Sequence, residues 1–279
     1  MRFLRSNDAV LCAVWAAAVC LLAMRVAPAS AQAPDTVFLE ELTWTELRAA
    51  IRAGKTTVIV PIGGTEQNGP HMALGKHNAR VRTLAERIAR ALGDALVAPV
   101  IAYVPEGALQ PATGHMRFPG TITVPDEVFR RGLEAAAQSF RLHGFRDIVF
   151  LGDHGSTQDS QKAVAARLNR TWRSESVRAH SIEAYYRAAT VEFRELLKAR
   201  GFGADELGEH AALTDTSLTL ALDPRLVRPV APRDNDRLPG VGTGVDGDPR
   251  RASAELGRLG VDLIVTRTVA AIKASTTHR

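Results

Sequence analysis

Histidine and carboxylate side chains are concentrated in a few loop segments of this sequence. Five of the eight histidines stand beside glycine, proline or acidic residues, and four carboxylates accompany them. A single loop histidine is usually a hydrogen-bonded structural residue. Five such histidines indicate a metal site, because Zn, Mn and Fe accept neutral imidazole and carboxylate as ligands. The residues concerned are His71, His77, His115, His154, His210, Glu66, Asp153, Glu209 and Asp215.

Two of these loops follow predicted buried strands. Residues 56–62 (TTVIVPI) and 147–151 (DIVFL) are almost entirely apolar, and glycine follows each of them. Helical patterns alternate with strand-like segments through the rest of the chain. This alternation predicts an α/β fold, a three-layer α/β/α sandwich with a mostly parallel central sheet. Helices are expected at 43–54, 78–92, 126–142, 160–172, 190–200 and 250–274, and further strands at 95–104 and 177–184.

The position of the polar loops in such a fold predicts where the site lies. Ligands of parallel sheets bind at the carboxyl ends of the strands. The loops at 63–77 and 152–159 leave those ends, and both are rich in residues that can bind a metal. We therefore expect the two loops to contribute to one site.

Other function classes find little support in the composition and motifs. The formal net charge is +5 over 279 residues, and no run of basic residues with interleaved aromatics supports nucleic-acid binding. The chain lacks the glycine-rich phosphate-binding motifs. Ser156 and Ser217 do not stand in the G-x-S-x-G pattern of serine hydrolases.

Residues 1–33 have the pattern of a secretory signal peptide. Arg2 and Arg5 precede an apolar run at 9–24, and 29–33 (ASAQA) contains two overlapping A-x-A cleavage sites. The apolar run is shorter than the about 20 residues of a membrane span. An uncleaved membrane anchor is the alternative interpretation.

Cleavage would leave residues 34–279 as a single domain without cysteine, because Cys12 and Cys20 both lie in the signal segment. A chain without cysteine is suited to an oxidising compartment. We expect a periplasmic or secreted protein that does not contact the membrane after cleavage.

Five segments in order resemble the creatininase (creatinine amidohydrolase) family, over nearly all of the chain after the signal peptide. They are 61–77 (PIGGTEQNGPHMALGKH), 115–121 (HMRFPGT), 152–157 (GDHGST), 209–217 (EHAALTDTS) and 244–249 (GVDGDP). The resemblance implies a metal-dependent amidohydrolase on the fold predicted above. It also implies a small-molecule substrate and a homo-oligomer.

The resemblance implies metal ligands at Glu66, Asn68, His77 and His154, and two of these positions depart from the family pattern. Members of the family characteristically hold two metals. Asn68 stands where the family has a histidine, and His77 stands where it has a bridging carboxylate. Ser156 also replaces a carboxylate that true creatininases place there. We therefore expect one divalent metal per chain (Zn, Mn or Fe), held by Glu66, His77 and His154.

The remaining candidates have a functional and a structural interpretation each. The resemblance places His210, paired with Glu209, beside the metal as a proton-transfer group, and the alternative is a helix cap. Asn68 either contacts substrate or water, or belongs to a turn before Gly69. The other candidates are substrate-facing or ligand-supporting residues, or else ordinary loop, turn or helix-terminal residues: His71, His115, Asp153 and Asp215.

These features together predict a hydrolase of a non-peptide or cyclic C–N (amide) bond. Metal-bound water would be the nucleophile, and His210 would be the acid and base. The alternative is a non-catalytic exported binding protein on the same fold, which has lost the two-metal site.

Overall fold

Four parallel strands form the central sheet of the computed structural model, which describes residues 34–228 and 242–277. The predicted signal peptide lies outside the described residues. The strand order is β2-β1-β3-β4. Strand β1 pairs with β3 along its whole length, from Thr57 opposite Asp147 to Ile62 opposite Gly152. The strands are β1 (Thr57–Ile62), β2 (Ala95–Val97), β3 (Asp147–Gly152) and β4 (Arg178–Ser181).

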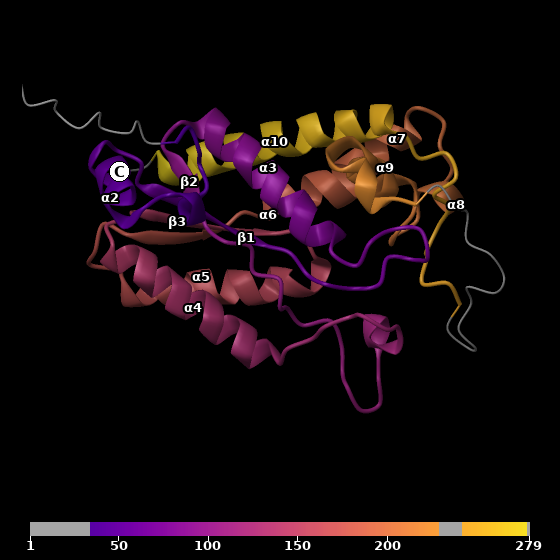
Figure 1. Cartoon of the computed structure of the whole chain (residues 1–279), viewed down its shortest axis with the longest axis horizontal. Helices are drawn as coiled ribbons and strands as arrows, with labels where there is room; N and C mark the ends of the chain where they lie inside the picture. The colour runs from indigo at the N-terminus through magenta and orange to yellow at the C-terminus, as the bar shows by residue number, and fades with distance from the viewer. Residues whose placement is uncertain (1–33, 229–241, 278–279) are drawn as a thin grey trace, which may run out of the picture. The chain divides into compact units, whose positions relative to one another are not determined.

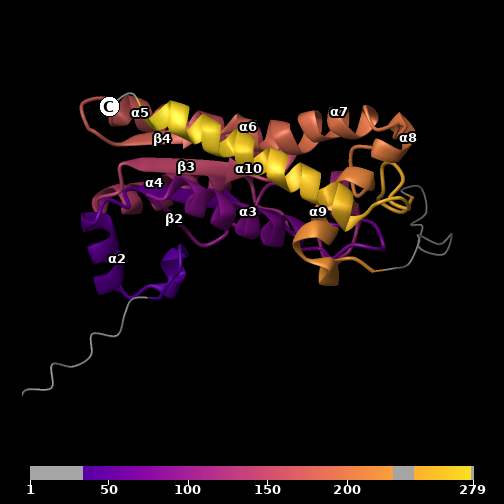
Figure 2. The ribbon, with the colours of Figure 1, turned by 90° about the horizontal axis from the view of Figure 1, so that it is seen from above.

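Helices cover both faces of this sheet, which confirms the predicted three-layer α/β/α arrangement (Figure 1). Helices α3 (Lys76–Leu92) and α10 (Ala254–Thr276) lie on one face, and α4 (Asp126–Leu142) and α5 (Gln158–Thr171) lie on the other. Viewed from above, α10 crosses over the strands on the side of α3 (Figure 2).

Alternate strand residues supply the two halves of the core, as the period of two in a strand requires. In β1, Ile59 packs with the α3 and α10 side, whereas Val58 and Val60 pack with the α4 and α5 side. All six residues of β1 are buried, and so are all six of β3. Because helices cover both faces of these strands, both sequences are almost continuously apolar.

The predicted helix boundaries agree with the structure to within a few residues, except where short elements intervene. Helix α2 (Trp44–Arg52) begins at the predicted capping box, in which Thr43 and Glu46 bond each other's backbone. The predicted strand at 95–104 is shorter, because only β2 pairs along the sheet and the chain then continues through single bridges. The other helices are α6 (Glu183–Arg187), the π-helical turn Ala188–Glu192, α7 (Phe193–Lys198), α8 (Ala204–Leu207) and α9 (Leu213–Leu222).

The strand order places a crevice at the carboxyl ends of β1 and β3. The chain passes from β1 to β2 on one side, and later adds β3 and β4 on the other side of β1. The connections of β1 and β3 therefore leave in opposite directions, which is the arrangement that opens a ligand site in parallel sheets.

The described residues from Asp35 onward belong to one compact unit. Within residues 34–228 and 242–277, no helix is both long enough and apolar enough to cross a membrane.

Candidate metal centre

The carboxylate of Glu66 is the centre of a cluster of imidazoles at this sheet edge. Its Oε1 lies 2.8 Å from Nε2 of His77, and its Oε2 lies 2.7 Å from Nε2 of His154. Nε2 of His115 is 3.2 Å from Oε2. Glu66 is fully buried. Burial alone would raise its pKa, but His77 and His154 hold the pKa of Glu66 well below its usual range.

Asp153 orients the ring of His77. Nδ1 of His77 lies 2.6 Å from Oδ2 of Asp153, and we assign the proton to this nitrogen. Asp153 also accepts hydrogen bonds from the Tyr185 hydroxyl at 2.6 Å and from Nε of Arg80 at 2.8 Å. An imidazole that donates one N–H to a carboxylate presents its other nitrogen as a ligand, which is the usual arrangement of metal-binding histidines.

Ser156 orients the ring of His154. Nδ1 of His154 lies 2.7 Å from Oγ of Ser156, and that hydroxyl donates a 2.6 Å hydrogen bond to the carbonyl of Pro105. The backbone N–H of Ser156 also lies 3.2 Å from Nδ1 of His154, so Ser156 holds this nitrogen from two sides and leaves Nε2 as the one that faces Glu66. Ser156 therefore supports His154 rather than supplying a carboxylate.

Glu106 brings a second carboxylate to the cluster, and the sequence analysis did not identify it. Its Oε2 lies 3.2 Å from Nε2 of His154. Burial, followed by the charge of Glu66, raises the pKa of Glu106 to about 9. A sequence signal for Glu106 was its position just after the apolar segment 95–104, because the other candidate loops also follow apolar segments.

The structure brings together a larger group of possible ligands than the predicted set. Among the described residues, Glu66, Glu106, His115 and His154 each offer one ligand atom, and these atoms all lie within 4.8 Å of one another. His77 does not belong to that group, although it contacts the other oxygen of Glu66.

Two buried cations, Lys76 and Arg80, lie behind the cluster on the first two turns of α3. Nζ of Lys76 lies 2.8 Å from Oδ2 of Asp215 and 3.9 Å from Oε1 of Glu66. Arg80 pairs with Asp153 and Asp215, each at 2.8 Å. Burial opposes ionisation of Asp215, but Lys76 and Arg80 hold the pKa of Asp215 well below its usual range. These two cations pair closely with Asp153 and Asp215, whereas Glu66 has only the longer contact with Lys76, and Glu106 contacts no lysine or arginine among these groups.

Gln67 fixes the proton positions of two further histidines. Its Oε1 accepts from the backbone N–H of Gly69 at 2.9 Å, and its Nε2 donates to the carbonyl of Gly244 at 3.0 Å. Nε2 of His210 also lies 3.1 Å from this Nε2, but it donates to the Gln67 carbonyl, so we assign the second Nε2 hydrogen of Gln67 to Nδ1 of His115 at 3.0 Å. The proton of His115 is then on Nε2, which faces Glu66.

The Gln67 backbone orients His210. Nε2 of His210 donates to the Gln67 carbonyl at 3.0 Å, so the lone pair is on Nδ1, 3.7 Å from Oε1 of Glu66. Burial, followed by the charge of Lys76, lowers the pKa of His210 to about 3. His210 is therefore a neutral imidazole at physiological pH, with a free acceptor nitrogen facing the cluster. It does not cap α9, whose N-cap is Ala212.

The structure corrects the expected role of Glu209. Its side chain is 77% exposed and lies 3.8 Å from Arg194, so it does not orient His210. Neighbouring residues in the chain can point in opposite directions, and the Gln67 carbonyl makes the contact expected of Glu209.

Three other candidates brace the loops around the cluster. Asn68 donates to the carbonyls of Glu66 and Ala73, as a turn residue would. Nε2 of His71 bonds the Thr216 hydroxyl at 3.0 Å, which ties its loop to α9. Asp215 bonds Lys76 and Arg80 and accepts from the backbone of Ala211, so it supports the two cations behind the cluster.

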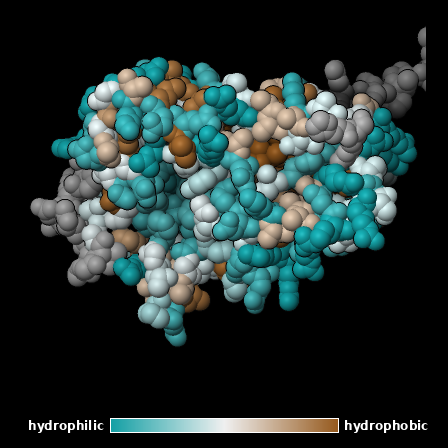
Figure 3. Space-filling model, turned by 180° about the vertical axis from the view of Figure 1, so that it is seen from behind, coloured by the Kyte–Doolittle hydropathy of each residue, from teal (hydrophilic) through white to brown (hydrophobic). Residues whose placement is uncertain are grey.

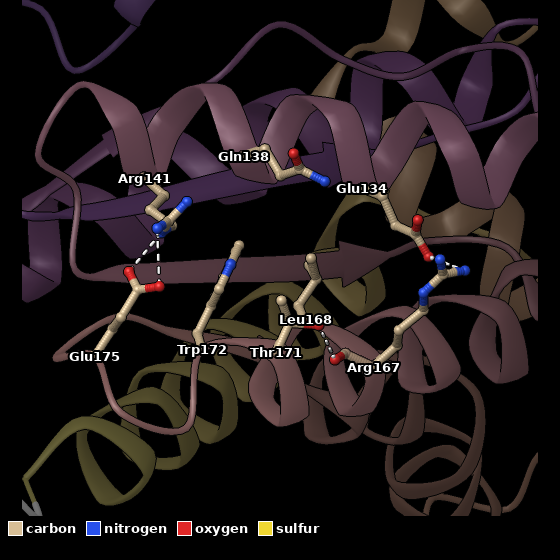
Figure 4. Close-up of a pocket in the computed structure, with 8 residues that line it drawn as sticks. All are labelled: Glu134, Gln138, Arg141, Arg167, Leu168, Thr171, Trp172 and Glu175. Carbon is tan, nitrogen blue, oxygen red and sulfur yellow. Dashed lines mark hydrogen bonds and ion pairs between the residues drawn. The ribbon is translucent and has the colours of Figure 1, made fainter.

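The surface has a hydrophilic hollow and a separate cavity lined by ion pairs. Seen from behind, the hollow lies beside the projecting loop that contains residues 105–119 (Figure 3). A separate cavity of about 250 Å³ lies between α4 and α5 (Figure 4). The charges that line it pair with each other, Arg141 with Glu175 at 2.6 Å and Arg167 with Glu134 at 3.2 Å. The α4–α5 cavity therefore offers no unpaired charge among these groups to a ligand.

The fold and the cluster are those of a metal-dependent α/β hydrolase. The chain belongs to the creatininase family, because the family model for creatinine amidohydrolase matches residues 40–272. It is therefore an amidohydrolase of that family, with a cluster of glutamates and histidines suited to one divalent metal.

Relatives and solved structures agree with this assignment. The chain is 26% identical to the creatinine amidohydrolase of Pseudomonas putida, over 69% of this chain and 74% of that protein. It is 30% identical to a mycofactocin precursor peptide peptidase of Mycobacterium tuberculosis, over 72% and 78% respectively.

Solved creatininases share the fold. A crystal structure of creatinine amidohydrolase matches with a TM-score of 0.70 and 27% identity, covering 88% of this chain and all of that one. A mutant creatininase of Zn–Zn type matches with a TM-score of 0.70 and 25% identity, covering 87% and 99%. A manganese form also matches, with a TM-score of 0.69 and 25% identity over 86% and 99%.

Proposed function

We propose that this protein hydrolyses a non-peptide or cyclic C–N bond of a small molecule, with one divalent metal held by Glu66, His77 and His154. The observation that carries the proposal is the paired orientation of the two imidazoles. Both Nδ1 atoms bond to supporting groups, Asp153 and Ser156, and both Nε2 atoms face the Glu66 carboxylate. This chain's donor set, imidazole plus carboxylate, fits Zn, Mn or Fe.

A divalent metal at such a site polarises a substrate carbonyl and lowers the pKa of bound water. His210 acts on the protons of the reaction. With a pKa of about 3, this imidazole is a weak base in the resting protein, and the negative charge that develops as water attacks raises its proton affinity. Its free Nδ1 then accepts a proton from the attacking water and returns that proton to the leaving nitrogen as the C–N bond breaks. The hydrogen bond from Nε2 to the Gln67 carbonyl keeps Nδ1 directed at the cluster throughout.

The charge of the cluster favours one metal rather than two. When all four are ionised, the carboxylates of Glu66, Glu106, Asp153 and Asp215 face the two cations Lys76 and Arg80, which leaves an excess of two negative charges. Ionisation of Glu106, whose pKa is about 9 in the metal-free protein, accompanies binding of the ion. One divalent ion neutralises that excess. A second ion would have to bind beside Lys76, which already lies 3.9 Å from Glu66.

The substrate class is tested by screening the purified protein after metal analysis. The panel contains cyclic amides including creatinine, formamides and short peptides. It also contains a cyclic polyol ketone, because a relative from Thermotoga maritima is a 3-dehydro-scyllo-inosose hydrolase. Hydrolysis of a cyclic amide or formamide that requires the metal supports the proposal. A protein that binds substrate analogues but holds no metal and hydrolyses nothing would support the binding-protein alternative.

We also propose that the protein is exported, on the basis of the pattern at residues 1–33. A homo-oligomer stays a prediction that rests on the family resemblance alone.

A further inference from the structure

Glu106 is a buried carboxyl group whose oxygens have no hydrogen-bond partner among the described residues. Its side chain is fully buried, and both Oε1 and Oε2 are unsatisfied by any donor of suitable geometry. Leaving a buried polar group without a partner is costly, and the cost is greater for a charged group. In the metal-free protein the raised pKa of Glu106 keeps its carboxyl group protonated, where it faces Glu66 and His154, and an ionised Glu106 would need a cation as its partner.

The backbone opposite Glu106 is shaped to admit its carboxyl group. A Cβ atom on Gly64 would lie 2.7 Å from Oε1 of Glu106 and 3.2 Å from the side chain of Val104. On its own segment, the N–H of Glu106 donates to the Thr123 hydroxyl at 2.9 Å. The space at Gly64 and the backbone hydrogen bond to Thr123 therefore direct the Glu106 carboxyl group toward the cluster.

The distances suit shared coordination of an ion. Oε2 of Glu106 lies 3.2 Å from Nε2 of His154, and Nε2 of His154 lies 2.7 Å from Oε2 of Glu66. Two ligands that each lie about 2.0–2.2 Å from one metal are separated by roughly 3.3–3.6 Å in a tetrahedral site, so Glu66 and His154 would move apart by less than about 1 Å to admit the ion between them. A metal between them would satisfy the orphaned oxygens and would neutralise the charge that Lys76 and Arg80 leave uncompensated.

His115 is as close to Glu66 as a metal ligand would be, but the nitrogen that faces Glu66 carries the proton. The Gln67 amide is oriented by Gly69 and Gly244, so it donates to Nδ1 of His115. A neutral His115 then has its hydrogen on Nε2, the atom 3.2 Å from Oε2 of Glu66. This nitrogen can donate a hydrogen bond to Glu66 or to substrate, but it has no lone pair for a metal.

We propose that Glu106 is a protein ligand of the metal, in addition to Glu66, His77 and His154, and that His115 is a hydrogen-bond donor beside the metal. This inference rests on the proposed function, because it presupposes that the site holds a divalent ion. Its consequence is that a loop after β2 supplies a carboxylate to the same metal as the loops after β1 and β3.

The experiment compares two variants of neighbouring residues, Glu106→Gln and His115→Gln. Metal-free full-length protein is titrated with Zn²⁺ by calorimetry, and the absorption spectrum of the Co²⁺-loaded protein is recorded for each form. Glu106→Gln should weaken Zn²⁺ binding by more than the roughly 10–100-fold loss typical of residues that only orient ligands, and should change the Co²⁺ spectrum. His115→Gln should weaken Zn²⁺ binding by no more than the roughly 10–100-fold loss of a residue that only supports a ligand, and should leave the Co²⁺ spectrum unchanged. Glu209→Gln serves as the exposed carboxylate control.

The outcomes separate this inference from the proposed function. Wild-type protein that binds no Zn²⁺ overturns the proposed function and the inference with it. If the wild type and Glu106→Gln bind Zn²⁺ equally tightly, the inference alone is overturned. If His115→Gln loses Zn²⁺, the proton assignment of His115, on which the inference depends, is wrong. If Glu106→Gln does not fold, Glu106→Asp keeps the carboxylate but withdraws it by one methylene. That variant should bind Zn²⁺ more weakly than the wild type, and unchanged affinity would overturn the inference.

Discussion

Nε2 of His154 lies 2.7 Å from Oε2 of Glu66, although 88 positions separate these residues and they follow different strands. The full-length pairing of β1 with β3 brings the two strand ends to the same point of the sheet edge. Nδ1 of His154 is held by Ser156, so the approach of Nε2 to Glu66 is set by the fold. A carboxylate oxygen and an imidazole nitrogen at this distance share a hydrogen bond in the metal-free protein, and both atoms can bind a divalent ion that displaces the proton.

His210→Ala should lower kcat by about 10²–10⁴-fold and leave the metal content unchanged. That range is the usual size of a general acid–base contribution. The loss should appear in kcat and kcat/KM together, because proton transfer contributes only in the transition state. Steady-state kinetics and elemental analysis of the same preparation test this. Loss of the metal would make His210 a ligand, and unchanged kinetics would mean that the proton-transfer group is elsewhere.

Glu209→Gln is the matched control for His210→Ala. Glu209 precedes His210 in the chain, but its side chain is 77% exposed. We expect an effect on kcat that is far smaller than that of His210→Ala. A loss comparable to that of His210→Ala would show that the carboxylate turns inward during the reaction.

The metal-free protein should lose stability as the pH rises from about 7 to about 9, because below about pH 6.5 the lowered pKa of His210 acts in the opposite direction. Burial and the Glu66 charge raise the pKa of Glu106 to about 9 in the fold, from 4.5 in an unfolded chain. The folded state then binds more protons than the unfolded state within this window, so its stability contribution is complete below pH 4.5 and declines as the pH approaches 9. Urea unfolding of chelator-treated protein at several pH values measures the slope.

Glu106→Gln should flatten this pH dependence, because glutamine does not titrate. Wild-type protein with bound Zn²⁺ should show the smaller slope as well, since the ion stabilises the ionised carboxylate. An unchanged slope in the glutamine variant would assign the effect to another group.

Arg80→Met should lower the free energy of unfolding by about 3–5 kcal/mol, the usual cost of leaving a buried charge without its partner. Arg80 bonds Asp153 and Asp215, and the variant would leave both carboxylates less compensated. Arg258→Met is the control, because it breaks an exposed pair with Glu255 at 3.0 Å that is worth about 0–1 kcal/mol. Chemical denaturation of the two variants provides the comparison, and equal effects would refute the importance of burial.

Exported protein should lack the first 31 or 33 residues, because cleavage after Ala31 or Ala33 fits the A-x-A pattern. Intact-mass measurement on protein from the periplasm or medium tests this. A full-length cytosolic product would contradict the prediction, and a full-length membrane-bound product would support the uncleaved anchor.

The sequence was sufficient to predict the layers of the fold because β1 and β3 are buried on both faces and are therefore continuously apolar. It also identified Glu66, His77 and His154 as residues that follow these strands. The loops at 63–77 and 152–159 meet at the predicted edge, since parallel strands place their carboxyl ends together.

Side-chain directions could not be predicted from the sequence. Glu209 and His210 are adjacent, yet one faces solvent and the other faces Glu66. Glu106 lacked a histidine neighbour in sequence, and only the geometry of Gly64 and His154 shows that it belongs to the cluster. The proton positions on His115 and His210 depend on Gln67, which is a long-range contact.

Elemental analysis of purified, extensively dialysed protein tests the central claim most directly, with wild type and His154→Ala measured side by side. The account predicts close to one equivalent of Zn, Mn or Fe per wild-type chain and almost none in His154→Ala. Two tightly held metals per wild-type chain, or a full equivalent in His154→Ala, would contradict a single metal centred on Glu66.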